Sequence, residues 1–103
     1  MALGFDENGS GPVLVLIHGF PFDRTMWSAQ LEGLSDIRKV VAVDLPGRGK
    51  SEGFAGTSMD AYADEVVGTL DGLDAKDADI AGMSMGGYVA LAVLRRHPEK
   101  VRS

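Results

Sequence analysis

The sequence predicts an α/β fold, a three-layer sandwich in which a parallel sheet of about three strands lies between crossover helices. Two observations lead to this prediction. Three short apolar runs, at residues 12–18, 40–43 and 79–82, suit strands that are covered on both faces of a sheet. A segment with apolar residues at helical spacing follows each run, and this alternation favours right-handed crossovers between parallel strands.

The first strand and the first helix follow a polar start. Residues 1–11 are rich in glycine and acidic side chains and are interpreted as a lead-in or a frayed remnant of a hairpin. The run at 12–18 is the first strand, and Gly19-Phe20-Pro21 ends it. Asp23 can cap a helix that extends to about residue 34. The expected core-facing side chains of this helix are Trp27, Leu31 and Leu34.

The second strand, at 40–43, ends at Asp44, and a glycine-rich turn follows at 45–49. Residues 50–56 are expected to be a loop, and Ser58 or Thr57 caps the next helix. That helix closes at Gly72, and its apolar side chains share one face, namely Met59, Tyr62, Ala63, Val66, Val67 and Leu70.

The third strand, at 79–82, leads through a tight turn into a third helix. Val89, Ala92 and Val93 are expected to face the sheet from this helix. The helix must stop near Arg96, because Pro98 disfavours a helical conformation at the residue before it. Arg95 and Arg96 complement the helix dipole and are interpreted as a solvated end.

Composition limits the function classes. The formal charge of −5 and the lack of a basic cluster argue against nucleic-acid binding. The absence of cysteine excludes disulfides and thiolate chemistry. The N-terminus does not resemble a secretory signal and no apolar run is long enough for a membrane span, so we expect a soluble, cytoplasmic protein without membrane contact. We expect no cofactor and no metal.

The turn between the third strand and the third helix carries the chemistry. Gly82, Ser84 and Gly86 form the pattern G-x-S-x-G, which is typical of a nucleophile elbow. A serine at the tip of so tight a turn needs neighbours without a Cβ, because a side chain two residues away would collide with backbone. The turn also opens a helix, so the Met85 amide points toward an oxyanion that forms beside the serine.

Three motifs in order resemble the α/β-hydrolase family, and in particular its esterase, lactonase and cofactor-free haloperoxidase-like members. The motifs are Ile17-His18-Gly19-Phe20-Pro21, Asp44-Leu45-Pro46-Gly47-Arg48-Gly49-Lys50-Ser51 and Gly82-Met83-Ser84-Met85-Gly86-Gly87. The resemblance implies that residues 12–103 are the N-terminal half of such a domain, a truncated α/β-hydrolase fold. It also implies site roles by position: Ser84 as nucleophile, the Phe20 and Met85 amides as oxyanion-hole donors, and His18, Gly19, Gly82 and Gly86 as supporting residues.

Two other interpretations of these motifs were weighed. Ser84 could be an ordinary helix N-cap, although the agreement of three motifs argues against it. Gly49-Lys50-Ser51 follows a strand, as the end of a phosphate-binding P-loop does, but that motif needs glycine where Asp44 stands. The nucleotide-binding interpretation is therefore rejected.

A serine hydrolase also needs a histidine base and an acid that orients it. The family order is serine, acid and then histidine, and after Ser84 the only candidates are Glu99 and His97. His97 stands at the far end of the third helix, too far from Ser84, and is interpreted as a helix-terminating residue. His18 is a poor base because of its place before the oxyanion glycine. Asp44 and Asp23 lie at the active edge by topology, and no orienting acid can be chosen between them.

These features leave three functional hypotheses. The first is an esterase-like serine hydrolase fragment that acts on small esters, with an elbow and an oxyanion hole but an incomplete triad. The second is a non-catalytic, self-associating half-fold, because the third strand becomes an uncovered sheet edge and could pair with a second copy through Asp79–Gly82. The third is an oligomer in which His18 or His97 of a second copy completes the site.

Overall fold

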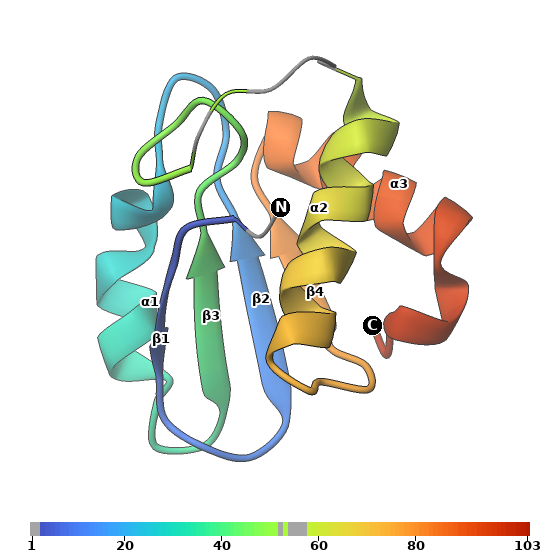
Figure 1. Ribbon diagram of the computed structural model, residues 1–103. Coiled ribbons are helices and arrows are strands. Elements are labelled where there is room, and N and C mark those ends of the chain that lie inside the picture. The colour runs from blue at the N-terminus through green and yellow to red at the C-terminus, as the bar shows by residue number, and fades with distance from the viewer. Residues whose placement is uncertain (1–2, 52, 54–57) are drawn as a thin grey trace.

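The computed structural model describes residues 3–51, 53 and 58–103, and its centre is a four-stranded sheet. The strand order is β1-β3-β2-β4, so β2 lies between β3 and β4. β3 and β4 both run parallel to β2. Figure 1 shows helices on both faces of the sheet. The strands are β1 (Phe5–Asn8), β2 (Val13–Ile17), β3 (Lys39–Val43) and β4 (Asp79–Gly82).

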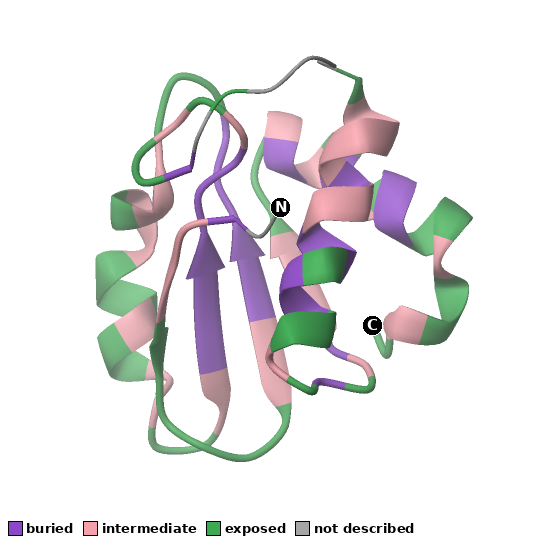
Figure 2. Ribbon diagram, in the orientation of Figure 1, coloured by how far each residue is buried: buried purple, intermediate pink, exposed green. Residues whose placement is uncertain are grey.

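Side chains alternate between the two faces of the sheet, as the period of two in a strand requires. On β2 and β3, Leu16, Val40 and Ala42 face α1 (Ser28–Gly33), and Trp27 packs against this cluster as predicted. Val15, Ile17, Val41 and Val43 face the opposite layer, which is formed by α2 (Met59–Gly72) and α3 (Met85–Arg96). Both strands are therefore covered on both faces, and Figure 2 shows that burial concentrates on them.

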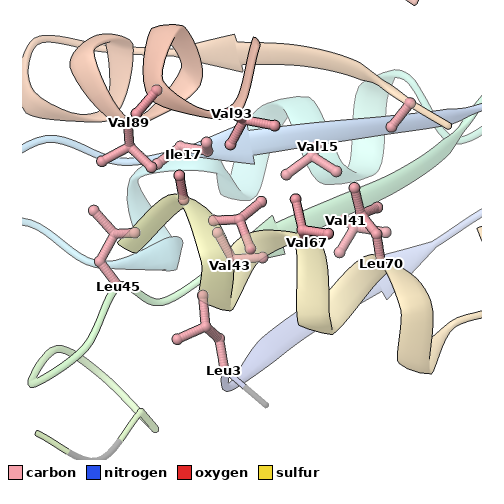
Figure 3. Close-up of a cluster of buried hydrophobic side chains, with 14 of the residues drawn as sticks. Leu3, Val15, Ile17, Val41, Val43, Leu45, Val67, Leu70, Val89 and Val93 are labelled. Atoms are coloured by element: carbon pink, nitrogen blue, oxygen red, sulfur yellow. The ribbon is translucent and has the colours of Figure 1, made fainter. Parts of the chain in front are cut away.

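The two long helices use the apolar faces that their sequences predict. In α2, Ala63, Val66, Val67 and Leu70 are buried, and in α3 Val89, Ala92 and Val93 are buried. These side chains meet in the cluster of Figure 3. Ser58 caps α2, since its hydroxyl accepts a hydrogen bond of 3.0 Å from the Ala61 amide. Thr57, the alternative cap, lies outside the described residues, as does most of the expected loop at 50–56.

Two expectations for the first 34 residues were wrong. Residues 5–8 are not a lead-in but form β1, which pairs antiparallel with β3 and adds a fourth strand. Leu3 is also buried, 3% exposed, in the main core. The expected helix at 23–34 is two elements, a 3₁₀ turn at Arg24–Trp27 followed by the short helix α1. Asp23 does cap the first of them, because its carboxylate accepts from the Thr25 amide.

The β4 strand is an edge of the sheet, but the end of the chain covers part of it. Val101 forms a parallel bridge with Ala78, just before β4. The Ala78 amide donates to the Lys100 carbonyl and the Ile80 amide donates to Ser103, each at 2.9 Å. Fewer backbone groups of β4 are thus open to a second chain than the sequence led us to expect.

Candidate active site

Ser84 stands at a strained turn between β4 and α3. Its φ of 53° and ψ of −116° lie where side-chain-bearing residues are rare. The two flanking glycines of the motif permit this turn by close backbone approach. A Cβ on Gly82 would lie 2.2 Å from the Gly86 carbonyl oxygen, and a Cβ on Gly86 would lie 2.2 Å from the Ile17 carbonyl oxygen. Neither position can hold a larger residue without moving the elbow.

The Ser84 side chain does not act as a helix cap. It makes no capping hydrogen bond to the α3 backbone, and the residue is exposed. The N-cap interpretation of the G-x-S-x-G pattern is therefore wrong. The exposed hydroxyl lies at the N-terminal end of α3, where the helix dipole favours negative charge.

The end of β2 brings the predicted oxyanion loop to the elbow. The Met83 amide donates to the Ile17 carbonyl at 3.1 Å. A Cβ on Gly19 would lie 3.0 Å from the Met83 carbonyl oxygen and 3.3 Å from the Ser84 Cβ, so a side chain here would be tight and glycine eases the approach of the two segments. Within the part of the chain that the structure describes, the Phe20 and Met85 amides have no hydrogen-bond acceptor. Two unpaired N–H donors thus flank the closest approach of the loop and the elbow.

His18 is buried, and both nitrogens of its ring are engaged. The Leu45 amide donates to Nε2 at 2.9 Å, so Nε2 is the unprotonated nitrogen. Nδ1 therefore carries the hydrogen and donates to the Gly19 carbonyl at 3.0 Å. This ring ties the start of the predicted oxyanion loop to the turn after β3. It has no nitrogen free to take a proton from Ser84.

The two acids expected at this edge, Asp44 and Asp23, accept hydrogen bonds from nearby backbone amides and side chains. Asp44 is fully buried, and its carboxylate accepts from the Arg24 guanidinium and from the Arg24 and Lys50 amides, at 2.7–2.8 Å. Asp23 caps the 3₁₀ turn, and hydrogen bonds from the Thr25 hydroxyl and amide lower the pKa of its carboxyl. Neither acid contacts a histidine through a hydrogen bond.

His97 is the C-cap of α3, at the opposite end of the helix from Ser84. Its Nε2 lies 2.8 Å from the Asp64 carboxylate on α2. Arg96 also donates to Asp64 through two N–H groups, and Arg95 pairs with Asp60. Both arginines at the end of α3 are exposed, as expected for a solvated end, and they also form ion pairs that join α3 to α2.

These ion pairs predict a pH-dependent stability. Hydrogen bonds from Arg96 and His97 lower the pKa of Asp64 to about 2. Because the folded pKa lies below the ordinary value of 3.8, the pairs stabilise the fold above about pH 4, and this stability is lost as the pH falls toward about 2. Asp64 is partly exposed, so we expect a contribution of about 1 kcal/mol or less.

We expect Asp64→Asn to lose less stability than the wild type between about pH 5 and pH 2.5, measured by urea unfolding. Asp36→Asn is the matched control, because Asp36 is an exposed carboxylate that makes no ion pair in the described part of the chain. Equal pH profiles for Asp64→Asn and the wild type would contradict the prediction.

A surface pocket of about 360 Å³ adjoins the elbow and is lined by Ser84, Gly87, Tyr88 and Leu91. Sequence reasoning missed Tyr88 and Leu91 as site residues. The signal was present, because four and seven residues after Ser84 fall on the same face of a helix. No group of three or more His, Cys, Asp or Glu side chains placed to hold a metal ion occurs among the described residues.

Comparison with known proteins agrees with this geometry. The family model described as "Alpha/beta hydrolase family" matches residues 14–102. The chain belongs to the alpha/beta hydrolase family. This α/β-hydrolase chain is 40% identical over 101 residues to the 2-hydroxymuconate semialdehyde hydrolase of Pseudomonas sp. (strain CF600), covering 93% of this chain and 36% of that relative.

Further relatives of this α/β-hydrolase chain include esterases. It is 32% identical to the pimeloyl-[acyl-carrier protein] methyl ester esterase of Nitrosomonas europaea, covering 98% of this chain and 38% of that one. The solved structure of a thermophilic esterase from Thermogutta terrifontis aligns with a TM-score of 0.92 and 42% identity, over 96% of this chain and 37% of that one. The chain thus spans less than two fifths of the length of these relatives. None of its helices in the described residues is long and apolar enough to cross a membrane.

Proposed function

We propose that this chain carries the nucleophile and the oxyanion hole of an esterase-like serine hydrolase that acts on small esters. The observation that carries the proposal is the elbow itself. Ser84 is exposed at a strained turn with no capping bond, and the unpaired Phe20 and Met85 amides lie on the segments that approach it. A serine with only a structural role would not need this arrangement.

The reaction follows from these groups. Ser84 Oγ attacks the carbonyl carbon of an ester and gives its proton to a base, while the carbonyl oxygen becomes an oxyanion. The Phe20 and Met85 amides donate to that oxyanion. Collapse of the tetrahedral intermediate breaks the bond to the leaving oxygen, which takes the proton from the base and leaves an acyl-serine. Water then releases the acid by the same two steps.

The base must come from outside the groups described above. His18 has both nitrogens engaged, and His97 lies at the far end of α3. A base in further sequence, or in a second copy, would complete the site. In the chain alone, an elbow and an oxyanion hole can still accelerate acyl transfer, by up to about 10³-fold over water.

Added imidazole can act as the missing base in a direct test. We expect the chain to hydrolyse p-nitrophenyl acetate in imidazole buffer faster than buffer alone, and an acetyl group to appear on Ser84 by mass spectrometry. Ser84→Ala should abolish both signals. Ser35→Ala is the control, because the Ser35 hydroxyl donates to the Glu32 carbonyl in α1 and has no other hydrogen-bond partner among the described residues. Activity that persists in Ser84→Ala would overturn the proposal.

A second candidate is self-association, supported by an exposed apolar row on α3. Tyr88, Leu91 and Leu94 are exposed along this helix, beside the edge strand β4. A two-fold dimer through Asp79–Gly82 would cover both features. Residues 100–103 bond to Ala78 and Ile80, so the C-terminal end of β4, at Ala81 and Gly82, is left for the contact.

Leu94→Glu tests the dimer without touching the pocket residues. We expect it to shift sedimentation from dimer toward monomer, because a carboxylate would be buried in the contact. Ile37→Glu is the control, since Ile37 is exposed near the opposite edge of the sheet, before β3. If the wild type sediments as a monomer at high concentration, the dimer proposal is wrong.

A further inference from the structure

The turn after β3 holds the oxyanion loop at both of its ends. At the start of the loop, the Leu45 amide of this turn bonds the His18 ring. At the far end, the Arg48 guanidinium reaches the segment 20–22. Figure 1 shows the loops after β2 and β3 together at the carboxyl ends of the strands, where α3 also begins. No role for Arg48 was predicted from the sequence beyond its place in the turn motif.

Arg48 contacts three consecutive residues. Its Nε donates to the Phe22 carbonyl at 3.1 Å, and its Nη2 donates to the Pro21 carbonyl. Its guanidinium carbon lies 5.7 Å from the centroid of the Phe20 ring, within the range of a cation–π contact. These contacts hold the side chain of Phe20 and the two residues that follow the peptide unit whose amide is the proposed oxyanion donor.

We call the contacts of Arg48 with Phe20, Pro21 and Phe22 the Arg48 clasp, and its chemistry is specific to arginine. Nε–H and Nη2–H point from the same edge of one planar group, so they fit two successive carbonyls at once. A lysine ammonium is a single point charge and offers no such fork. The position of Arg48 is itself fixed, because its amide donates to the Leu45 carbonyl at 3.0 Å. Two residues further on, the Lys50 amide donates to the carboxylate of the buried Asp44 at 2.8 Å.

The clasp acts on a loop that has little else to hold it. Phe20 is 69% exposed and Phe22 is also exposed, so neither is anchored in the core. One backbone bond, from the Phe22 amide to the Gly19 carbonyl at 2.9 Å, closes the turn. Without Arg48, the described bonds that orient the peptide unit of the Phe20 amide would be those to the Gly19 carbonyl, from the Phe22 amide and from His18 Nδ1.

We propose that Arg48 is a positioning residue that fixes the Phe20 amide in the direction required for oxyanion binding. This inference rests on the proposed function, because it gives Arg48 a part in the same reaction. Arg48 touches neither the substrate nor the reacting atoms. It acts through the loop, so its loss should lower transition-state stabilisation and leave ground-state binding almost unchanged.

The test compares Arg48→Ala, Arg48→Lys and the wild type by two readouts. The first is hydrogen exchange at the Phe22 amide, relative to core amides of β3. We expect this exchange to be about tenfold faster in Arg48→Ala, with β3 unchanged. The second is Ser84-dependent turnover of p-nitrophenyl acetate with imidazole. We expect kcat to fall by about 10- to 100-fold and KM to stay within about twofold.

Two further variants separate positioning from charge and from folding. Arg48→Lys keeps the charge but not the fork, so it should remain well below the wild type, while added ethylguanidinium should partly restore Arg48→Ala. Arg102→Ala is the matched control. The Arg102 side chain is half-exposed, and its Nε lies 3.9 Å from the Asp77 carboxylate, so its ion pair does not involve the loop. This substitution should change neither readout.

Each result supports or overturns the inference. Unchanged exchange at Phe22 in Arg48→Ala overturns it, as does faster exchange with an unchanged kcat, or full activity in Arg48→Lys. Failure of the proposed function looks different. In that case wild type and Ser84→Ala would turn over ester equally, while exchange at Phe22 would still report whether Arg48 holds the loop.

Discussion

Replacing Gly86 by alanine is expected to destabilise the fold by about 3 kcal/mol, because the new methyl group has no room. The added Cβ would lie 2.2 Å from the Ile17 carbonyl oxygen and 2.6 Å from the His18 carbonyl oxygen. Both obstacles are backbone atoms at the end of β2, so no side chain can rotate away. The start of α3 must move off the sheet, and Ser84 moves with it. Urea unfolding measures the loss in free energy.

Gly68→Ala is the matched control for this substitution. Gly68 lies inside α2, and an added Cβ there would meet no heavy atom within 4 Å. Alanine should therefore stabilise the helix by about 0.5–1 kcal/mol, since it reduces the backbone freedom of the unfolded chain. The two substitutions add the same methyl group and should change stability in opposite directions. Equal changes in the free energy of unfolding would show that helix propensity, and not the close backbone contact, determines the effect of Gly86→Ala.

The features that the sequence predicted well depend on local patterns. The strands at 13–17 and 39–43, the buried faces of α2 and α3, and the end of α3 before Pro98 follow from spacing within a few residues. The elbow can be recognised from the local spacing of Gly82, Ser84 and Gly86, although the close approach at Gly86 is to the distant end of β2. Such features can be predicted from a single short stretch of sequence.

The features that it missed depend on distant partners. β1 has the polar sequence Phe5-Asp6-Glu7-Asn8, which is stable as a strand only because β3 pairs with it. The expected helix at 23–34 begins as a 3₁₀ turn, and there the Arg24 amide bonds Asp44, twenty residues away. The Arg48 clasp joins residues more than twenty-five positions apart. No periodicity in the sequence reports contacts of this kind.

Asp44 is the residue where these long-range contacts converge, and Asp44→Ala is expected to cost about 3–5 kcal/mol. The substitution removes a fully buried carboxylate that accepts from the Arg24 side chain and from two backbone amides. Arg24 is itself largely buried, so its charge would lose its better-buried partner. The backbone amides of Arg24 and Lys50 would also lose their acceptor. Urea unfolding again provides the measurement.

Asp6→Ala separates the buried pair from a surface one. Asp6 also pairs with Arg24, at 2.8 Å, but its side chain is 40% exposed. We therefore expect a cost of at most about 1 kcal/mol, and one that salt reduces further, whereas salt should change the Asp44 effect little. The two variants remove the same chemical group from the same arginine. If they cost the same free energy, the burial of Asp44 would not be the source of its contribution.

Asp44→Ala should also change the environment of the His18 ring at the candidate site, because the amide of the next residue, Leu45, donates a hydrogen bond to that ring. A looser turn would weaken that bond and the hold of Arg48 on the oxyanion loop. We expect the ring resonances of His18 to shift in Asp44→Ala and to stay in place in Asp6→Ala, measured by NMR under folding conditions. An unchanged His18 ring in a folded Asp44→Ala protein would show that the turn keeps its shape without the carboxylate. On the present geometry that outcome is not expected, since the Asp44 carboxylate is the acceptor that fixes the Lys50 amide at the end of the turn.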